Sequence, residues 1–273
     1  MPFQADCHIH SMFSGDSESL PEETVHAALG KGLDKIIFTD HCECDGEKAF
    51  PPGIPAWEPF ELANYVKYIE TVRTRFSEAP IEIGTGLELG SAVHNKPFAE
   101  KVLSFYDWDF IIGSNHIVRG QYDFYYLNYR EIDTEKIFRQ YFEELYELAQ
   151  DDNFDVLGHL YYFVRYAHRQ GVEVHLEKYR ADIAQIYKEI IQNGKGIEVN
   201  TSHIDREYGK AIPDLEYVRL FRECGGEIVT VGSDAHTSEA VGRGQKEALE
   251  ILREAGFKAV ASFTRRKPVF KDI

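Results

Sequence analysis

Two hydrophobic patterns alternate along the chain. Short apolar runs such as KIIFT at residues 35–39 are typical of β-strands, whereas residues 59–75 carry Phe60, Ala63, Val66 and Ile69 at helical spacing. The pattern predicts strands at residues 3–9, 35–39, 81–89, 110–114, 155–158, 196–200 and 227–232, with a short closing segment at 258–263. It predicts helices at residues 22–31, 59–75, 96–104, 134–150, 176–192, 213–222 and 239–255.

The alternation predicts a parallel sheet, because each strand is followed by a helix that can return the chain to the same edge. Seven or eight such units in 273 residues favour a (β/α) barrel, with an open doubly wound sheet as the alternative. We expect a single domain spanning residues 1–273. Residues 46–59, which contain four prolines, are expected to form an ordered loop after the second strand.

The charge balance restricts the partners. The chain has 30 Lys and Arg against 46 Asp and Glu, a net charge of −16, so its field repels nucleic-acid phosphates and anionic membranes. No apolar run approaches the roughly 20 residues that span a bilayer, and the first residues do not resemble a signal peptide. With only four cysteines as well, we expect reduced thiols and a cytoplasmic location.

Candidate metal ligands follow nearly every predicted strand. His8 and His10 are two apart in the first strand, so both imidazoles face one side of it. The other candidates at or near strand ends are Asp16, His41, Glu88, His116, His159, Asp234 and His236. Because the carboxyl ends of parallel barrel strands meet at one face, these side chains are expected to converge. By contrast, His26, His94 and His175 are expected at the surface, while His168 and His203 lie in loops.

Nine ligands exceed the need of one ion. A catalytic zinc uses about three protein ligands, so nine predict two or three divalent ions. Mixed imidazole and carboxylate donors suit Zn, Mn or Fe. Clustered divalent ions are a recurrent device of phosphoester hydrolysis, which makes a phosphoesterase the leading hypothesis.

The ordered motifs resemble the PHP (polymerase and histidinol phosphatase) family over essentially the whole chain. The matching pieces are Asp6-x-His8-x-His10-Ser11, Thr39-Asp40-His41, Gly86-x-Glu88, His116, Gly158-His159 and Gly232-Ser233-Asp234-Ala235-His236. The resemblance implies a distorted TIM-like (β/α)7 barrel with parallel strands and a site for three metals. It implies one ion on His8, His10, Glu88 and Asp234, a second on Glu88, His116 and His159, and a third on Asp16, His41 and His236. Many relatives carry histidine where this chain has Asp16, and the aspartate favours Mn or Fe somewhat over Zn.

Within that family the chain looks most like the histidinol-phosphate phosphatases. The stretches that carry this are Gly158-His159-Leu160 with Val164-Arg165-Tyr166, Glu198 to Ser202 with Arg206, and the tail Phe263 with Arg266-Lys267-Pro268. The resemblance implies hydrolysis of L-histidinol phosphate, in histidine biosynthesis, to L-histidinol and phosphate by a metal-bound hydroxide. Arg165 and Arg206 would hold the phosphate. Asp234, His236 or His203 would manage the leaving-group proton, and Asp40 would orient His41 or a neighbour.

The substrate would be a small phosphorylated amino alcohol. Glu43 and Asp45 are candidates for its amine, and the aromatic residues Tyr122, Phe124, Tyr125 and Tyr126 for its ring. The main alternative is another PHP phosphoesterase, acting on nucleotides or phosphotyrosine. A proofreading exonuclease, a binding module without activity and a barrel amidohydrolase remain further alternatives. The sequence leaves the oligomeric state open.

Overall fold

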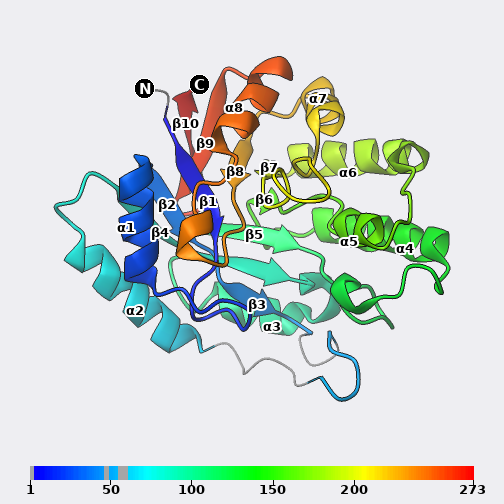
Figure 1. Ribbon diagram of the computed structural model, residues 1–273, viewed down its shortest axis with the longest axis horizontal. Coiled ribbons are helices and arrows are strands. Elements are labelled where there is room, and N and C mark those ends of the chain that lie inside the picture. The colour runs from blue at the N-terminus through cyan, green and yellow to red at the C-terminus, as the bar shows by residue number, and fades with distance from the viewer. Residues whose placement is uncertain (1–2, 46–48, 55–60) are drawn as a thin grey trace.

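Seven parallel strands form a nearly closed barrel in the computed structural model, which describes residues 3–45, 49–54 and 61–273 (Figure 1). Along the sheet they are β1 (Ala5–Ile9), β2 (Lys35–Phe38), β4 (Glu82–Gly90), β5 (Phe110–Ser114), β6 (Val156–Leu157), β7 (Gly196–Asn200) and β8 (Val229–Gly232). A short strand, β3 (His41–Glu43), continues the line of β2 and pairs with the second half of β4. The prediction of a distorted barrel is confirmed, and the open sheet is excluded.

The first and last barrel strands meet and close the barrel. The backbone N–H of Asp234 donates to the carbonyl of His8 at 2.8 Å, and that of His10 donates to the carbonyl of Ala235 at 2.9 Å. Asp234 itself has a left-handed backbone, with φ of 52°, which aspartate tolerates better than most residues do. The closure therefore brings the motifs at the two ends of the chain side by side.

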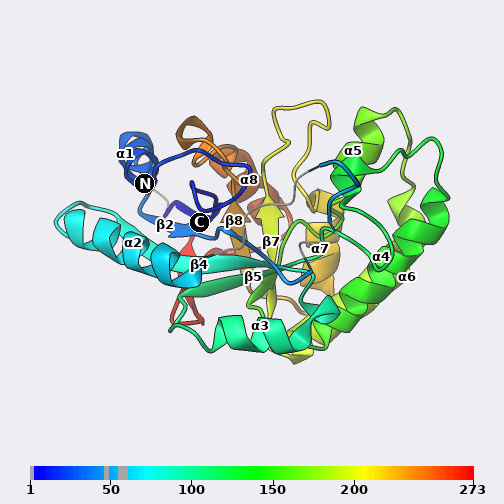
Figure 2. The same ribbon diagram turned by 90° about the horizontal axis from the view of Figure 1, so that it is seen from below.

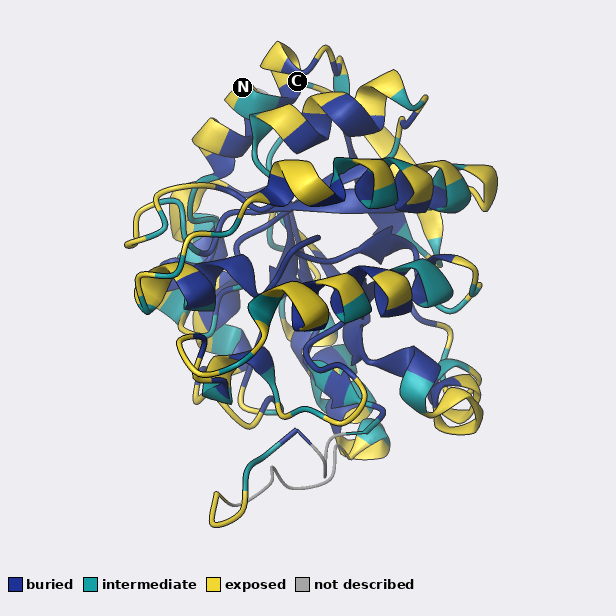
Figure 3. Ribbon diagram, turned by 90° about the vertical axis from the view of Figure 1, so that its right-hand side faces the viewer, coloured by how far each residue is buried: buried dark blue, intermediate teal, exposed yellow. Residues whose placement is uncertain are grey.

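Helices cover the outside of the barrel (Figure 2). They are α1 (Pro21–Lys31), α2 (Leu62–Arg75), α3 (Lys96–Leu103), α4 (Thr134–Ala149), α5 (Val164–Arg169), α6 (Arg180–Gln192), α7 (Leu215–Glu223) and α8 (Gln245–Glu254). Their inward faces are buried and their outward faces exposed, as amphipathic spacing requires, while the seven barrel strands are buried except for the first residue of β4 (Figure 3). No helix in the described residues is long and apolar enough to cross a membrane.

The amino ends of the strands are closed by apolar packing and ion pairs. An antiparallel hairpin, β9 (Ala259–Thr264) and β10 (Lys267–Asp272), follows α8. Phe263 of β9 packs on Phe110 of β5 at 4.8 Å between ring centroids. The Nζ of buried Lys35 lies 2.7 Å from Glu82, and the Nε of Arg266 lies 2.8 Å from Asp155. Arg266, which belongs to the tail that resembles the histidinol-phosphate phosphatases, thus has a structural role at the amino ends of the strands.

Most predicted elements are confirmed to within a few residues, and the exceptions have local causes. The predicted helix at 239–255 begins only at Gln245, because Gly242 and Gly244 have left-handed backbones after a 3₁₀ turn, η5 (Ser238–Ala240). The predicted helix at 176–192 opens as a separate 3₁₀ turn, η4 (Leu176–Tyr179). The pattern missed β3, α5 and β10, which are short or exposed. Parts of the loop at 46–59 lie outside the described residues.

Candidate metal centre

The structure gathers the nine predicted ligands at the carboxyl ends of the strands. Glu88 is the hub, because it lies within β4 at a buried position that the neighbouring strands surround. Five imidazole nitrogens lie within 3.4 Å of its two carboxylate oxygens, those of His8, His10, His41, His116 and His159. An oxygen of Asp234 lies 3.3 Å from Nε2 of His10, and an oxygen of Asp16 lies 3.1 Å from Nε2 of His236. Every member of the set is therefore in contact with another member.

The spacing of the nitrogen atoms fits bound cations. The Nε2 atoms of His8 and His10 lie 3.0 Å apart, and those of His116 and His159 lie 3.3 Å apart. Ligand atoms at about 2.1 Å from an ion in tetrahedral directions lie about 3.4 Å from one another. Donor atoms of His8, His10 and Glu88 form one compact group, and those of Glu88, His116 and His159 form a second. The donor set and its geometry fit divalent ions.

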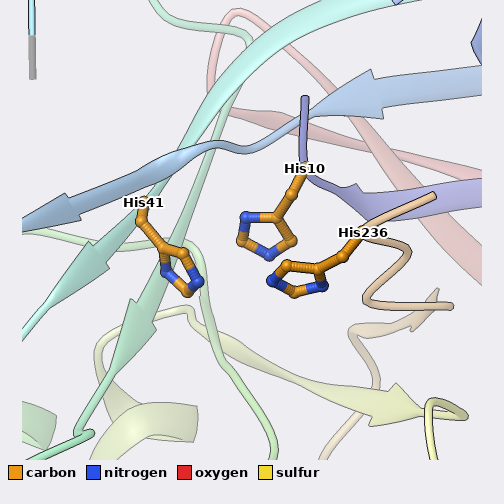
Figure 4. A group of neighbouring side chains, drawn as sticks. All are labelled: His10, His41 and His236. Atoms are coloured by element: carbon orange, nitrogen blue, oxygen red, sulfur yellow. The ribbon is translucent and has the colours of Figure 1, made fainter. Parts of the chain in front are cut away.

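A third group consists of His10, His41 and His236, whose rings point toward one another from three different segments (Figure 4). The rings of His10 and His236 stack with centroids 4.1 Å apart. One oxygen of Asp16 lies 3.1 Å from Nε2 of His236 and 3.7 Å from Nε2 of His41. The aspartate that departs from the family pattern is thus placed as a ligand would be.

The electrostatics show a cluster held together by opposite charges. Burial alone would lower the pKa of His8 and His116, but the carboxylates around them raise both pKa values well above the usual range. Burial alone would raise the pKa of Glu88, but His116 and His8 hold it well below its usual value. Protons on these imidazoles therefore balance the carboxylates when ions are lacking, and divalent cations could take their place.

Two further carboxylates orient the ligands from behind. Glu198 accepts a hydrogen bond from Nδ1 of His8 at 2.6 Å, and Glu43 accepts one from Nδ1 of His116 at 2.5 Å. In both cases the Nε2 atom is turned toward Glu88, the arrangement in which a carboxylate fixes the tautomer of a metal-binding histidine. Neither role was predicted from the sequence, in which Glu43 is a candidate for the substrate amine and Glu198 belongs to a stretch that resembles the histidinol-phosphate phosphatases.

Glycine makes room for each of these carboxylates. A Cβ atom on Gly232 would collide with the Glu198 carboxylate, and one on Gly90 would collide with the Glu43 carboxylate. Asp40 acts through an intermediate: it accepts a hydrogen bond from Ser14 at 2.8 Å, and Ser14 lies 3.0 Å from Nδ1 of His10. The predicted orienting role of Asp40 thus falls on His10.

A cavity of about 310 Å³ opens beside the cluster and is lined by three arginines. The predicted Arg165 is buried, and its guanidinium lies 3.1 Å from Ser202, 3.4 Å from Asp234 and 4.4 Å from the centre of the Tyr162 ring. The predicted Arg206 lines the cavity from an exposed loop. Arg169, one helical turn after Arg165 on α5, also lines it and was not predicted, because α5 itself was not.

The three residues considered for the leaving-group proton all line this cavity. Burial and Arg165 lower the pKa of His203 to about 3, and its Nδ1 lies 3.0 Å from Ser202. Asp234 has a pKa held well below its usual value: burial opposes ionisation, but His8 and its neighbours outweigh it. Burial would lower the pKa of His236, but Asp16 and Asp234 raise it.

The remaining expectations have mixed outcomes. His26 and His175 are exposed as predicted, but the surface position of His94 is wrong: its side chain is 3% exposed and lies 2.6 Å from Glu144. His168 packs against Tyr208, beside a different cavity. Of the four aromatic residues expected near the substrate ring, Phe124 is fully buried and Tyr122 is exposed, while Tyr125 and Tyr126 line a second cavity.

Comparisons with known proteins agree with this geometry. The PHP domain family profile matches residues 6–202, about 70% of the chain. The chain is 27% identical over 265 residues to the histidinol-phosphatase of Lactococcus lactis, covering 96% of this chain and 95% of that protein. It is 29% identical over 273 residues to a protein of Deinococcus radiodurans named probable histidinol-phosphatase, covering 96% and 97%.

Among solved structures, the histidinol phosphate phosphatase of Lactococcus lactis, crystallised with zinc, L-histidinol and phosphate, superposes with a TM-score of 0.84. The two chains are 26% identical, and the match covers 97% of this chain and 98% of that one. Together with the profile match over most of the barrel, the likeness assigns the family. This chain belongs to the PHP domain family.

Proposed function

We propose that this protein is a metal-dependent histidinol-phosphatase that hydrolyses L-histidinol phosphate to L-histidinol and phosphate. The observation that carries the proposal is the Glu88 carboxylate among five imidazoles, next to a cavity lined by arginines. Cation sites and fixed guanidinium groups together suit a phosphate monoester. Relatives that match nearly the whole chain bear the name of this activity, and one of them was crystallised with zinc and both products.

Two or three divalent ions would be held by the converging side chains. His8, His10, Glu88 and Asp234 would hold one, Glu88, His116 and His159 a second, and Asp16, His41 and His236 a third. When bound, such ions supply Lewis-acid stabilisation of phosphoryl charge and activate water. Zinc is the ion in the Lactococcus lactis structure, and Mn and Fe are also compatible with these donors.

The arginines would bind and orient the phosphoryl group. Arg165 is held in advance by Ser202, Asp234 and the Tyr162 ring, so its donors face the cavity at little entropic cost on binding. Arg206 lies on an exposed loop and would contact the phosphate from the solvent side. Fixed donors of this kind favour the charge that builds up on the phosphoryl oxygens in the transition state.

His203 would supply the proton that the departing alkoxide needs. It is the one residue of the three considered that is absent from the proposed ligand sets. Burial and the nearby Arg165 keep its ring neutral without substrate, and a phosphate dianion beside it would raise its pKa. Replacing His203 with Gln should slow the hydrolysis of histidinol phosphate at least tenfold. It should slow the hydrolysis of an aryl phosphate less than threefold, because that leaving group needs no proton. Equal slowing of both would contradict this role.

The substrate claim is tested by rates of phosphate release from the metal-replete protein. We expect kcat/KM for histidinol phosphate to exceed that for nucleotides, phosphotyrosine and an aryl phosphate by at least tenfold, about 1.4 kcal/mol. A nucleotide or phosphotyrosine as the best substrate would instead establish the alternative PHP phosphoesterase.

The proposal extends to the setting in which the enzyme works. The cysteines Cys7, Cys42, Cys44 and Cys224 are all unpaired, which fits a reducing compartment such as the cytoplasm. The net charge of −16 opposes binding to nucleic acid. Filter binding to DNA at low salt should therefore give no complex.

A further inference from the structure

A second cavity, of about 320 Å³, adjoins the arginine-lined cavity. The residues that line both cavities are Asp16, His41, His116, Tyr125 and Tyr166. The two spaces therefore share a wall of proposed metal ligands and tyrosines. A substrate whose phosphate occupies the first cavity can extend its other end into the second.

The two cavities differ in their balance of charge. The first is lined by Arg165, Arg169 and Arg206 in addition to the proposed metal ligands. The second shares His41 and His116 with the first, but its other described lining residues include no Lys, Arg or His. Its lining contains three carboxylates and four aromatic rings: Asp16, Glu43, Asp123, Phe50, Tyr125, Tyr126 and Tyr166. Aromatic faces beside carboxylates attract planar cations, because both present negative charge. The pair of cavities thus suits a molecule with an anionic and a cationic end.

Asp123 is the carboxylate of the second cavity that lacks a cationic partner among the described residues. Asp16 faces His236, and Glu43 faces His116. Asp123 instead accepts hydrogen bonds from the backbone N–H of Tyr125 at 2.7 Å and from the hydroxyl of Tyr162 at 3.4 Å. Burial raises the pKa of its carboxyl to about 6, although His116, the Tyr125 N–H and Arg165 oppose the rise. Its negative charge is thus opposed only by cations beyond ion-pair distance.

The local fold does not require that charge. Asp123 caps the short 3₁₀ turn η3 (Phe124–Tyr126), and its backbone N–H donates to the carbonyl of Ala49. Asparagine caps such turns as well as aspartate does, so an amide would serve the turn equally. A half-buried carboxylate in this place has a cost of desolvation that a cap alone does not explain.

We propose that the second cavity binds the cationic, planar end of the substrate, with Asp123 as its counter-ion and specificity-determining residue. The inference deepens the proposed function and rests on it: the ligand class is a phosphate monoester that carries a protonated imidazole or amine. Tyr125, Tyr126 and Phe50 supply the aromatic faces. Of the two sequence candidates for the amine, Glu43 is engaged by His116, and Asp45 is not among the residues that line the cavity.

The test compares Asp123→Asn with a matched control, Asp133→Asn. Asp133 caps α4 through Lys136 N–H and lies on the surface, so the control removes a capping charge elsewhere. We expect Asp123→Asn to lower kcat/KM for histidinol phosphate at least tenfold and to change kcat/KM for an aryl phosphate without a cationic group less than twofold. Asp133→Asn should change neither. An equal loss for both substrates, or no loss for either, would overturn the inference while leaving the proposed function intact.

A second measurement separates the two proposals. L-Histidinol, which has no phosphate, should inhibit hydrolysis of the aryl phosphate, and Asp123→Asn should raise its inhibition constant at least tenfold. If the wild-type protein shows no preference for histidinol phosphate, the proposed function fails. The inference about Asp123 then stands only if this rise in the inhibition constant is still observed, and it fails if the constant is unchanged.

Discussion

The two ends of the barrel are built on the same strands but balance charge differently. At the amino ends, Lys35 meets Glu82 and Arg266 meets Asp155, so each charged group has a partner of opposite sign. At the carboxyl ends, five imidazoles crowd one carboxylate, and three arginines line the neighbouring cavity. The first end is complete within the chain. Under the proposed function, cations and a phosphate would complete the second, which is how a binding site differs from a structural ion pair.

The largest effect is expected at the hub of the carboxyl end. Glu88→Gln keeps the shape but removes the charge that five imidazoles share, so the two ions that Glu88 would hold and turnover should both be lost. We expect kcat to fall at least a thousandfold, since clustered ions contribute several kcal/mol. Phosphate release and elemental analysis measure the two losses, and circular dichroism checks the fold. Full metal content with full activity would show that the two ends do not differ as described.

Metal removal tests the same contrast through stability. One ion bound only by the folded chain at a thousandfold excess over Kd stabilises it by about 4 kcal/mol, which corresponds to roughly 5–15 °C in melting temperature. Chelation of two or three ions should lower the melting temperature by at least that amount. Chelation should lower the melting temperature of the Glu88→Gln variant much less, because only the third ion can remain there, and an equal drop in the variant would argue against the site.

The orienting carboxylates should show an intermediate effect. In the wild type, Glu198 accepts a hydrogen bond from the backbone N–H of His159 at 2.9 Å, and in Glu198→Gln the glutamine keeps an oxygen for that bond. The substitution removes the negative charge that faces Nδ1 of His8. We expect metal affinity to fall about 10- to 100-fold. Titration of the metal-free protein measures this, with Glu82→Gln at the amino end as the control. An affinity change in the control as large as that in Glu198→Gln would contradict the orienting role.

The smallest effect is expected at the amino ends. Asp155→Asn removes the carboxylate that pairs with Arg266. Because Arg266 is partly exposed, the free energy of unfolding should fall by only about 1–3 kcal/mol. Metal content and kcat should stay within twofold of the wild type. Denaturant unfolding and phosphate release measure the two properties, and a large loss of kcat would erase the distinction between the ends.

The sequence predicted the barrel and the ligand set because both follow from local pattern. Strand ends in a parallel barrel converge whatever their loops do, so His8, Glu88 and His236 could be placed together without knowledge of any contact. The contact of Glu198 with His8 and the proposed role of Asp123 could not be predicted. Glu198 faces a nitrogen of His8, which is 190 residues away in the sequence, and Asp123 faces a cavity formed by several segments. Neither arrangement leaves a pattern along the chain.

The errors have the same origin. His94 looked like a loop residue on the surface, yet Glu144 of α4 covers it, a contact between segments 50 residues apart. Arg169 was missed because α5 has only six residues, too few to show helical periodicity. Strand β10 was missed because its residues are exposed on both faces and carry no alternation.

The most direct test of the account is the rate of phosphate release by the metal-replete protein with histidinol phosphate beside an aryl phosphate. The account predicts at least a tenfold higher kcat/KM for histidinol phosphate and loss of both activities on chelation. Equal rates for the two substrates, or hydrolysis that persists after the metal has been removed, would contradict it.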